Sequence, residues 1–464
     1  MATLPYFILS PNAVLSIIGL LHGPDKTVPT PPTDWRKATV DVIIPARNEE
    51  SNIVFCLNSL LSQTLKPSRI VLVDDDSSDR TVEYARDFCK VNGMDISIVQ
   101  REEAAGKTPT IKGAARESDS DVEFILDADT VLETPTYIER TVEELYKAVG
   151  IACACGNVLS FSRGDRRKLL RDAPLDAFQI QHPDAPLIPK RNLFGRLQGT
   201  LTSMYRDCLY VFLQRFVYRG QMTFFGSITH PVGCAVAYRR KYMKELFNKY
   251  EPIMGDNLTN SEDIFVGFAL VNQGYRNIQL QDVLCRSQDP TIGRLPRQYY
   301  MWSSAFLQSC YYFNSLVMTP FKVFKLWRHQ WKFKRSPEGK AIMEKRKIKE
   351  PYRAAFGDKH TEAYGRPMGW TIFMSAIEKV AFPTALLALL LMQQWEALIV
   401  TAVAETVLSL AILTWVAPSG TRLRYLLTGA LVTPIRYSAL LFDVTTIIRF
   451  AGDIWMRKDN RWRK

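Results

Sequence analysis

Two aspartates, Asp127 and Asp129, directly follow the apolar segment VEFIL in the sequence VEFILDADT. Alternate residues of an extended segment can place one carboxylate on a divalent cation and the other on the same cation or on an adjacent sugar. Carboxylate oxygens are hard ligands that suit Mg²⁺ or Mn²⁺. An isolated Asp-x-Asp pair is also common in polar loops. Its position behind a buried strand is what favours a metal site.

A second pair of acids, Glu262 and Asp263, occurs in the sequence NSEDI. One carboxylate there can take the proton of an attacking hydroxyl while a metal at the first pair neutralises a leaving diphosphate. The same residues also fit a helix N-terminus, with Ser261 as the cap and two acids favoured by the helix dipole. The two interpretations are compatible, because a cap would hold the base in place.

A third acidic group, Asp74 to Asp76, stands in the sequence VLVDDDSSDRT. One of these carboxylates can accept a hydrogen bond from the imide N–H of uracil, which would identify the base. The alternative is a turn and N-cap cluster that opens the next helix.

The elements that must position these acids alternate between strands and helices. The pattern predicts strands at 39–45, 69–73, 95–100 and 122–126, with helices at 49–63, 79–91 and 108–117 between them. Such a βαβαβ order indicates an α/β domain with a mostly parallel sheet. Ligands of open α/β sheets bind beyond the carboxyl ends of the strands, where these aspartates fall. A nucleotide-like ligand is therefore expected. The Pro-containing stretch 171–192 is expected to form loops over the sheet.

Three apolar segments follow, at about 370–393, 395–417 and 425–450, each near the ~20 residues that cross a hydrocarbon core. Charged residues interrupt all three, and we expect them to face protein, water or headgroups. They are Glu378, Lys379, Glu396, Glu405, Arg436 and Asp443. A further apolar segment at 5–22 is either a short span or an interfacial helix, and it lacks the features of a removable signal peptide. We favour an interfacial orientation for the third or fourth of these helices.

The formal charge of +12 is concentrated in two segments, 322–353 and 449–464, which carry 12 and 6 Lys/Arg respectively. Basic runs beside apolar segments favour contact with anionic lipid headgroups over a nucleic-acid groove. We therefore expect membrane lipids as partners and no nucleic acid. The 8 cysteines show no zinc spacing, which favours reduced thiols in the cytosol.

The order of five motifs resembles glycosyltransferase family 2, which has the GT-A fold. The motifs are VIIPARNEE, VLVDDDSSDRT, GK at 106–107, ILDADT and NSEDI. GCAVAYRR at 233–240, GYR at 274–276 and QYYMW at 298–302 extend the likeness, which covers about residues 39–305. QYYMW is similar to the Q-x-x-R-W of membrane-integrated hyaluronan, chitin and cellulose synthases.

The resemblance implies a role for each matching residue. The nucleotide-sugar donor would contact Ala46, Glu49, Asp75, Lys107, Asp127 and Gln298. Asp127 and Asp129 would hold Mn²⁺ or Mg²⁺, and Asp263 would be the general base with Glu262 beside it. Gly233, Cys234 and Trp302 would border the acceptor, with Trp302 stacking on its sugar. Without the resemblance, Lys107 would be an ordinary surface lysine, Cys234 a buried small residue and Trp302 a core residue.

One position departs from the pattern, because Met301 stands where the related synthases carry Arg. A thioether cannot replace a planar guanidinium that grips a diphosphate. We hypothesise that Arg294 or Arg297, just upstream in GRLPRQYYMW, supplies the charge.

These observations predict four regions: an apolar N-terminal segment (1–36), a GT-A catalytic domain (37–320), a basic interfacial segment (321–368) and transmembrane or interfacial helices with a basic tail (369–464). We expect an integral membrane glycosyltransferase with a cytosolic catalytic domain and a nucleotide-sugar donor, expected to be UDP-linked, that extends a polysaccharide. The alternatives are a single transfer to a membrane lipid acceptor and a catalytically silent membrane scaffold.

Overall fold

The computed structural model describes residues 11–22, 34–147, 150–190, 192–254, 261–340 and 358–456. Part of the basic run, at 341–353, and the basic tail from 457 onward lie outside the described residues, as do residues 5–10 of the N-terminal apolar segment.

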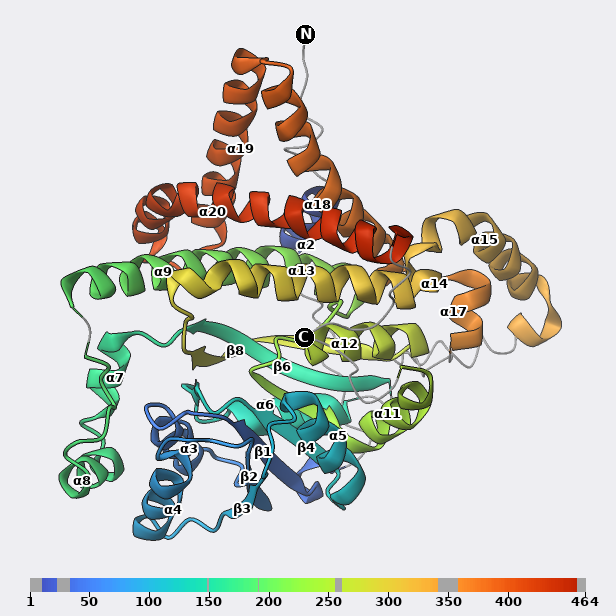
Figure 1. Ribbon diagram of the computed structural model, residues 1–464. Helices are drawn as coiled ribbons and strands as arrows, with labels where there is room; N and C mark the ends of the chain where they lie inside the picture. The colour runs from blue at the N-terminus through green and yellow to red at the C-terminus, as the bar shows by residue number, and fades with distance from the viewer. Residues whose placement is uncertain are drawn as a thin grey trace.

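One mixed sheet of eight strands organises the amino-terminal two thirds of the chain, in the order β3-β2-β1-β4-β7-β6-β8-β5 (Figure 1). β1, β2, β3 and β4 pair in parallel, as expected, whereas β7 runs antiparallel to both β4 and β6. The strands are β1 (Val40–Ala46), β2 (Arg69–Asp74), β3 (Ser97–Gln100), β4 (Val122–Leu126), β5 (Thr130–Leu132), β6 (Ile151–Ser160), β7 (Ala235–Arg239) and β8 (Arg276–Ser287). The predicted mostly parallel α/β sheet is confirmed.

Helices cover both faces of this sheet because alternate residues of each strand point to opposite sides. Val42 and Ile44 join a core with α3 (Ile53–Leu61), α4 (Thr81–Val91) and α6 (Tyr137–Tyr146). Ile43, between them, joins the opposite core. That second core includes α5 (Lys107–Glu117), α11 (Arg240–Met254) and α12 (Glu262–Gln273).

The expectation of loops across 171–192 is wrong for its first half. α7 (Arg163–Leu169) is followed by α8 (Ala173–Gln181). Pro174 stands in the first turn of α8, where its missing N–H has no helical acceptor to lose. Phe178 packs edge-on against Tyr84, with ring centroids 5.4 Å apart. This aromatic contact with α4 stabilises α8, a helix that the prolines in this stretch made difficult to predict.

A layer of long helices lies between the sheet and the apolar C-terminal region (Figure 1). It contains α9 (Leu193–Phe212) and α13 (Leu295–Tyr312), with α20 (Arg422–Ala451) packed against both. α9 continues through η2 (Leu213–Tyr218) into α10 (Arg219–Phe225). α14 (Asn314–Val317), α15 (Thr319–Arg335) and α17 (Asp358–Tyr364) follow α13 at one end of this layer. Three short turns complete the description: η1 (Trp35–Lys37), η3 (Ile292–Arg294) and η4 (Gly452–Met456).

Three helices are long and apolar enough to cross a membrane: α18 (Met368–Leu391), α19 (Trp395–Val416) and α20. α18 and α19 form an upright hairpin, whereas α20 runs across its base alongside α9 and α13 (Figure 1). α2 (Pro11–His22) packs against α10 and α18. Gly19 of α2 lies so close to Gly220 that a Cβ added at Gly19 would stand 2.9 Å from the Gly220 Cα atom.

Three of the charges inside these helices, Glu378, Glu405 and Arg436, face protein partners. Arg436 of α20 donates to Glu405 of α19 at 2.7 Å, and Tyr437 donates to the same carboxylate at 2.7 Å. Asn12 of α2 donates to Glu378 of α18 at 3.1 Å. These pairs join the helices to one another where an unpaired charge would be costly.

Candidate functional site

The edge of the sheet where β4 ends is the centre of the site. β7 runs antiparallel to β4, with Leu126 opposite Ala235. The residue after β4, Asp127, therefore meets the residues before β7, Gly233 and Cys234. The backbone N–H of Asp127 donates to the carbonyl of Cys234 at 2.9 Å. Antiparallel pairing thus brings the Asp-x-Asp motif beside a segment more than a hundred residues away in the sequence.

Lys107, the first residue of α5, connects the two predicted carboxylate pairs. Its Nζ atom lies 2.6 Å from Asp127 and 2.8 Å from Glu262. It also donates to the carbonyl of Gly233 at 3.0 Å. Burial alone would lower the pKa of Lys107, but the two carboxylates raise it well above its usual value. Lys107 is therefore a positively charged residue that connects the Asp127/Asp129 pair to the Glu262/Asp263 pair.

Asp263 is fixed by three donors around its carboxylate. Ser261 Oγ donates to it at 2.5 Å, the backbone N–H of Ile264 at 2.9 Å and the backbone N–H of Gly233 at 3.2 Å. Ser261 occupies the N-cap position of α12 without accepting a capping hydrogen bond. Its hydroxyl orients Asp263 instead, so the residue expected as a cap holds the candidate base by a different contact.

Glu49, Asp127 and Asp129 form an acidic group on the other side of Lys107. Burial, reinforced by Asp129, raises the pKa of Glu49 to about 7. Burial also raises the pKa of Asp127 to about 7, although Lys107 opposes the shift. The pKa of Asp129 is raised as well, chiefly by burial, and its side chain accepts from Thr130 and Ser287 at 3.1 and 3.3 Å. Negative charge is in excess here.

A divalent cation fits this group. Asp127 and Asp129 offer hard oxygen ligands, and a cation would stabilise the ionised carboxylates, which burial disfavours. Among the described residues, the only trio of ligand atoms within 4.8 Å of one another is Glu83, Asp87 and His182, on α4 and just after α8. Asp127 and Asp129 would therefore hold the cation together with oxygens of a bound substrate, the usual arrangement for Mg²⁺.

Asp75 is engaged by the loop before α5. Its carboxylate accepts from the backbone N–H groups of Ala105 and Gly106, each at 2.8 Å, and from Arg101 at 2.9 Å. Burial opposes ionisation, but these hydrogen bonds outweigh it and lower the pKa. Ala46, at the end of β1, accepts from the backbone N–H of Asp75 at 2.8 Å. Asp75 thus holds the loop that carries Lys107, and its Oδ2 atom, which accepts from Gly106, retains a lone pair for a ligand.

The guanidinium nearest Gln298 and Trp302 comes from a residue that the sequence did not single out. Arg206 of α9 donates to Gln298 Oε1 at 2.7 Å and lies 4.9 Å from the centre of the Trp302 ring. Its Nε atom is 3.6 Å from Asp289, and its side chain also donates to the hydroxyl of Tyr210. Arg206 is 4% exposed, whereas the previously favoured Arg294 and Arg297 are both exposed.

Cys234 lies 3.8 Å from Cys285, sulfur to sulfur, and both are free thiols. The contact with Cys285 and burial raise the pKa of Cys234 well above its usual value. A thiol with a raised pKa is a poor nucleophile. The raised pKa argues against Cys234 as a nucleophile, while its place beside the acceptor stays a prediction.

One family model and several curated relatives match parts of this chain. Residues 41–247 match the model of glycosyl transferase family 2. A 4,4'-diaponeurosporenoate glycosyltransferase of Staphylococcus haemolyticus is 34% identical over 23% of this chain and 28% of its own length. A poly-beta-1,6-N-acetyl-D-glucosamine synthase of Staphylococcus epidermidis is 28% identical over 25% and 28%. A dolichol-phosphate mannosyltransferase of Pyrococcus furiosus is 31% identical over 24% and 32%.

The chain spans only 18%, 28% and 39% of the lengths of the first three curated relatives that it matches. Among solved structures, a mannosyltransferase from Pyrobaculum calidifontis in complex with GDP-Man and Mn²⁺ superposes with a TM-score of 0.47. Its sequence is 17% identical, and the superposition covers 96% of this chain and 99% of that one.

Proposed function

Because residues 41–247 form a glycosyltransferase family 2 domain, we propose that this chain is a membrane-bound, inverting glycosyltransferase. It transfers a sugar from a nucleotide-sugar donor, expected to be a UDP-sugar, to a growing glycan. The catalytic domain faces the cytosol in this proposal, which the Lys/Arg bias beside the apolar helices supports. Relatives whose names specify a glycan synthase and a dolichol-phosphate transferase support both a glycan and a lipid as the acceptor class.

The observation that carries this proposal is the position of Lys107 between Asp127 and Glu262. This contact supports a metal and diphosphate station at Asp127 beside a carboxylate station at Glu262, which an inverting displacement would require. Asp127 and Asp129 would hold Mn²⁺ or Mg²⁺, which supplies charge neutralisation to the leaving diphosphate. Asp263, oriented by Ser261 and Gly233, accepts the proton of the acceptor hydroxyl.

The remaining residues have binding roles in the proposal. Ala46, Glu49 and Asp75 line the nucleoside side, where Asp75 also holds the loop before α5. Gln298 and Trp302 close the site from α13, with Arg206 between them. Gly233 and Cys234 border the acceptor. Arg294 and Arg297 remain candidates for the donor diphosphate, although Arg206 is the guanidinium in contact with Gln298.

The test is release of nucleoside diphosphate from a panel of nucleotide sugars, with Mn²⁺ and with Mg²⁺. We expect one donor to be turned over and turnover to cease when the metal is chelated. Absence of turnover with every donor, in the presence of cell membranes as a source of acceptor, would contradict the proposal. Product length then separates the two acceptors: a ladder or polymer indicates chain extension, and a single added sugar indicates a lipid acceptor.

A second candidate function, one transfer to a lipid-borne acceptor, is favoured by the helix layer itself. α9 and α13 carry Arg206, Gln298 and Trp302, and the candidate membrane helix α20 packs on both. An acceptor attached to a lipid would therefore reach the site without leaving the membrane surface.

A further inference from the structure

A cavity of about 470 Å³ opens between the catalytic sheet and the helix layer. Its walls are α7, the end of β6, α9, the residues after β8 and the start of α20. Five arginines line it, namely Arg163, Arg166, Arg167, Arg196 and Arg424. None of the sequence motifs includes these residues.

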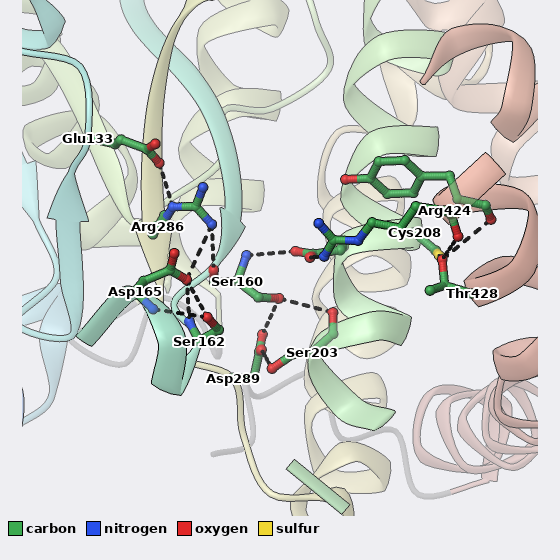
Figure 2. Close-up of polar contacts among 12 residues, drawn as sticks. Glu133, Ser160, Ser162, Asp165, Ser203, Cys208, Arg286, Asp289, Arg424 and Thr428 are labelled. Atoms are coloured by element: carbon green, nitrogen blue, oxygen red, sulfur yellow. Dashed lines mark hydrogen bonds and ion pairs between the residues drawn. The ribbon is translucent and has the colours of Figure 1, made fainter. Parts of the chain in front are cut away.

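The two acids in the cavity wall already accept hydrogen bonds from protein groups. Asp289 accepts from Ser160 Oγ at 3.1 Å and from Ser203 Oγ at 2.7 Å. Asp207 accepts from the backbone N–H of Ser160 at 2.9 Å and lies 3.8 Å from Arg424. Figure 2 shows Ser160, Ser203 and Asp289 pointing toward one another between the sheet and α9. Five arginines and two aspartates line the cavity, so its lining carries a net positive formal charge, which suits an anion.

The helices at the cavity expose apolar side chains beside those arginines. On α9, Leu193 and Leu197 are 84% and 57% exposed next to Arg196. On α20, Leu423 and Leu427 are 68% and 63% exposed next to Arg424. A free anion would gain nothing from the exposed leucines. A ligand with an anionic headgroup and apolar chains would contact both the arginines and the leucines.

The cavity also adjoins the candidate metal station. The backbone N–H of Gln288, which lines the cavity, donates to the carbonyl of Asp129 at 3.2 Å. Arg166 donates to Gln288 Oε1 at 2.7 Å and also to Asn52, the hydrogen-bond partner of Glu49. Gln288 therefore links the lining of the cavity directly to the Asp-x-Asp motif.

We propose that this cavity binds the phosphate headgroup of a membrane lipid, with Arg196 and Arg424 gripping the phosphate and the exposed leucines of α9 and α20 holding the acyl chains. This inference rests on the proposed function in one respect: the bound lipid is the carrier that presents the acceptor group to the catalytic site. Lipid binding itself is independent of turnover and is measured separately.

The binding experiment uses the full chain in detergent micelles and a fluorescent short-chain phosphatidic acid as the probe. We expect saturable binding that falls with added salt, because the contacts are electrostatic. The double variant R196Q/R424Q should weaken it about tenfold or more, the loss expected for charged hydrogen bonds. R422Q/R171Q is the matched control, since Arg422 and Arg171 are exposed arginines near Arg424 and α7 that do not line the cavity. It should bind the probe like the parent.

Three outcomes would overturn the inference. They are equal binding by the R196Q/R424Q variant, equal displacement of the probe by phosphatidylcholine of the same chain length, and displacement by inorganic phosphate at the same concentration as unlabelled phosphatidic acid. The last result would mean that the cavity takes a free anion. A matching melting temperature for parent and variant excludes loss of fold as the cause.

A transfer experiment with radiolabelled donor and cell membranes then tests the carrier role. We expect label in the organic extract, with R196Q/R424Q raising the KM for the lipid acceptor more than that for the donor. Label found only in material not extracted by organic solvent would overturn the carrier role. If no variant and no parent protein turns over any donor, the proposed function fails, while the binding result still decides the lipid site.

Discussion

The backbone amide of Gly233 donates to the carboxylate of Asp263 at 3.2 Å, and a Cβ added at Gly233 would stand 2.8 Å from that carboxylate. Only glycine leaves room for the candidate base at this position. The contact joins the segment before β7 to the first turn of α12, and it fixes the position of Asp263 relative to Asp127 through Lys107.

Substituting Gly233 by alanine should displace Asp263. We expect G233A to lower kcat by about tenfold or more, because small misplacement of a catalytic group is costly, with little change in donor affinity. The measurement is steady-state release of nucleoside diphosphate. G293A is the matched control, since a Cβ at Gly293 meets nothing within 4 Å. Parent-like kcat in G233A would show that the position of Asp263 does not limit the reaction.

The guanidinium of Arg206 should matter more than those of Arg294 and Arg297. R206Q removes the donor to Gln298 and the cation beside Trp302, so we expect kcat/KM to fall about tenfold or more, with partial recovery in R206K. R294Q and R297Q remove exposed charges and should change kcat/KM by less than about threefold. A larger loss in R294Q or R297Q than in R206Q would instead support the hypothesis that an upstream arginine replaces the missing one at position 301.

Metal affinity should rise with pH through neutrality. The pKa values of Asp127 and Glu49 are both raised to about 7, so each carboxyl must lose a proton before it favours a cation. Titration calorimetry with Mn²⁺ at about pH 6 and about pH 8 should show tighter binding at the higher value, with proton release at the lower one. The same shifts make the metal-free protein less stable as pH rises from the usual carboxyl range through about 7, since the folded state holds more protons there. An Mn²⁺ affinity that does not change between these two pH values would contradict the group of Glu49, Asp127 and Asp129 as the metal site.

The pair formed by Glu405 and Arg436 should stabilise the contact between α19 and α20. E405Q leaves Arg436 without its carboxylate partner, and we expect a loss of about 2 kcal/mol in the free energy of unfolding. Replacing both residues by leucine should recover part of it, because no unpaired charge remains. Thermal unfolding in detergent is the measurement. E396Q, a change of the same kind at an exposed position of α19, should leave stability unchanged.

Local patterns predicted the first four strands, the three helices between them, the apolar C-terminal helices and the acids at the strand ends. They did not predict β5 to β8 or the helices from α6 to α17. VEFIL followed by two aspartates is enough to place Asp127 at a sheet edge, and the observed strand β4 confirms it. The sequence did not indicate a role for Arg206, because its hydrogen bond to Gln298 spans 92 residues and depends on how α9 packs against α13. Its only local signal is Tyr210, one helical turn later. For α20 the sequence favoured an interfacial orientation only as one of two helices, because hydropathy measures length and composition. The contacts of α20 with α9 and α13 show how this helix lies.

The most direct test of the account is the release of nucleoside diphosphate by Asp263→Asn. Asparagine keeps the shape of the side chain and removes the carboxylate that accepts the proton, so we expect kcat to fall by about a hundredfold or more. Donor binding, measured with the metal present, should stay close to that of the parent protein. Release by Asp263→Asn at the parental rate would contradict Asp263 as the general base and with it the assignment of catalysis to this site.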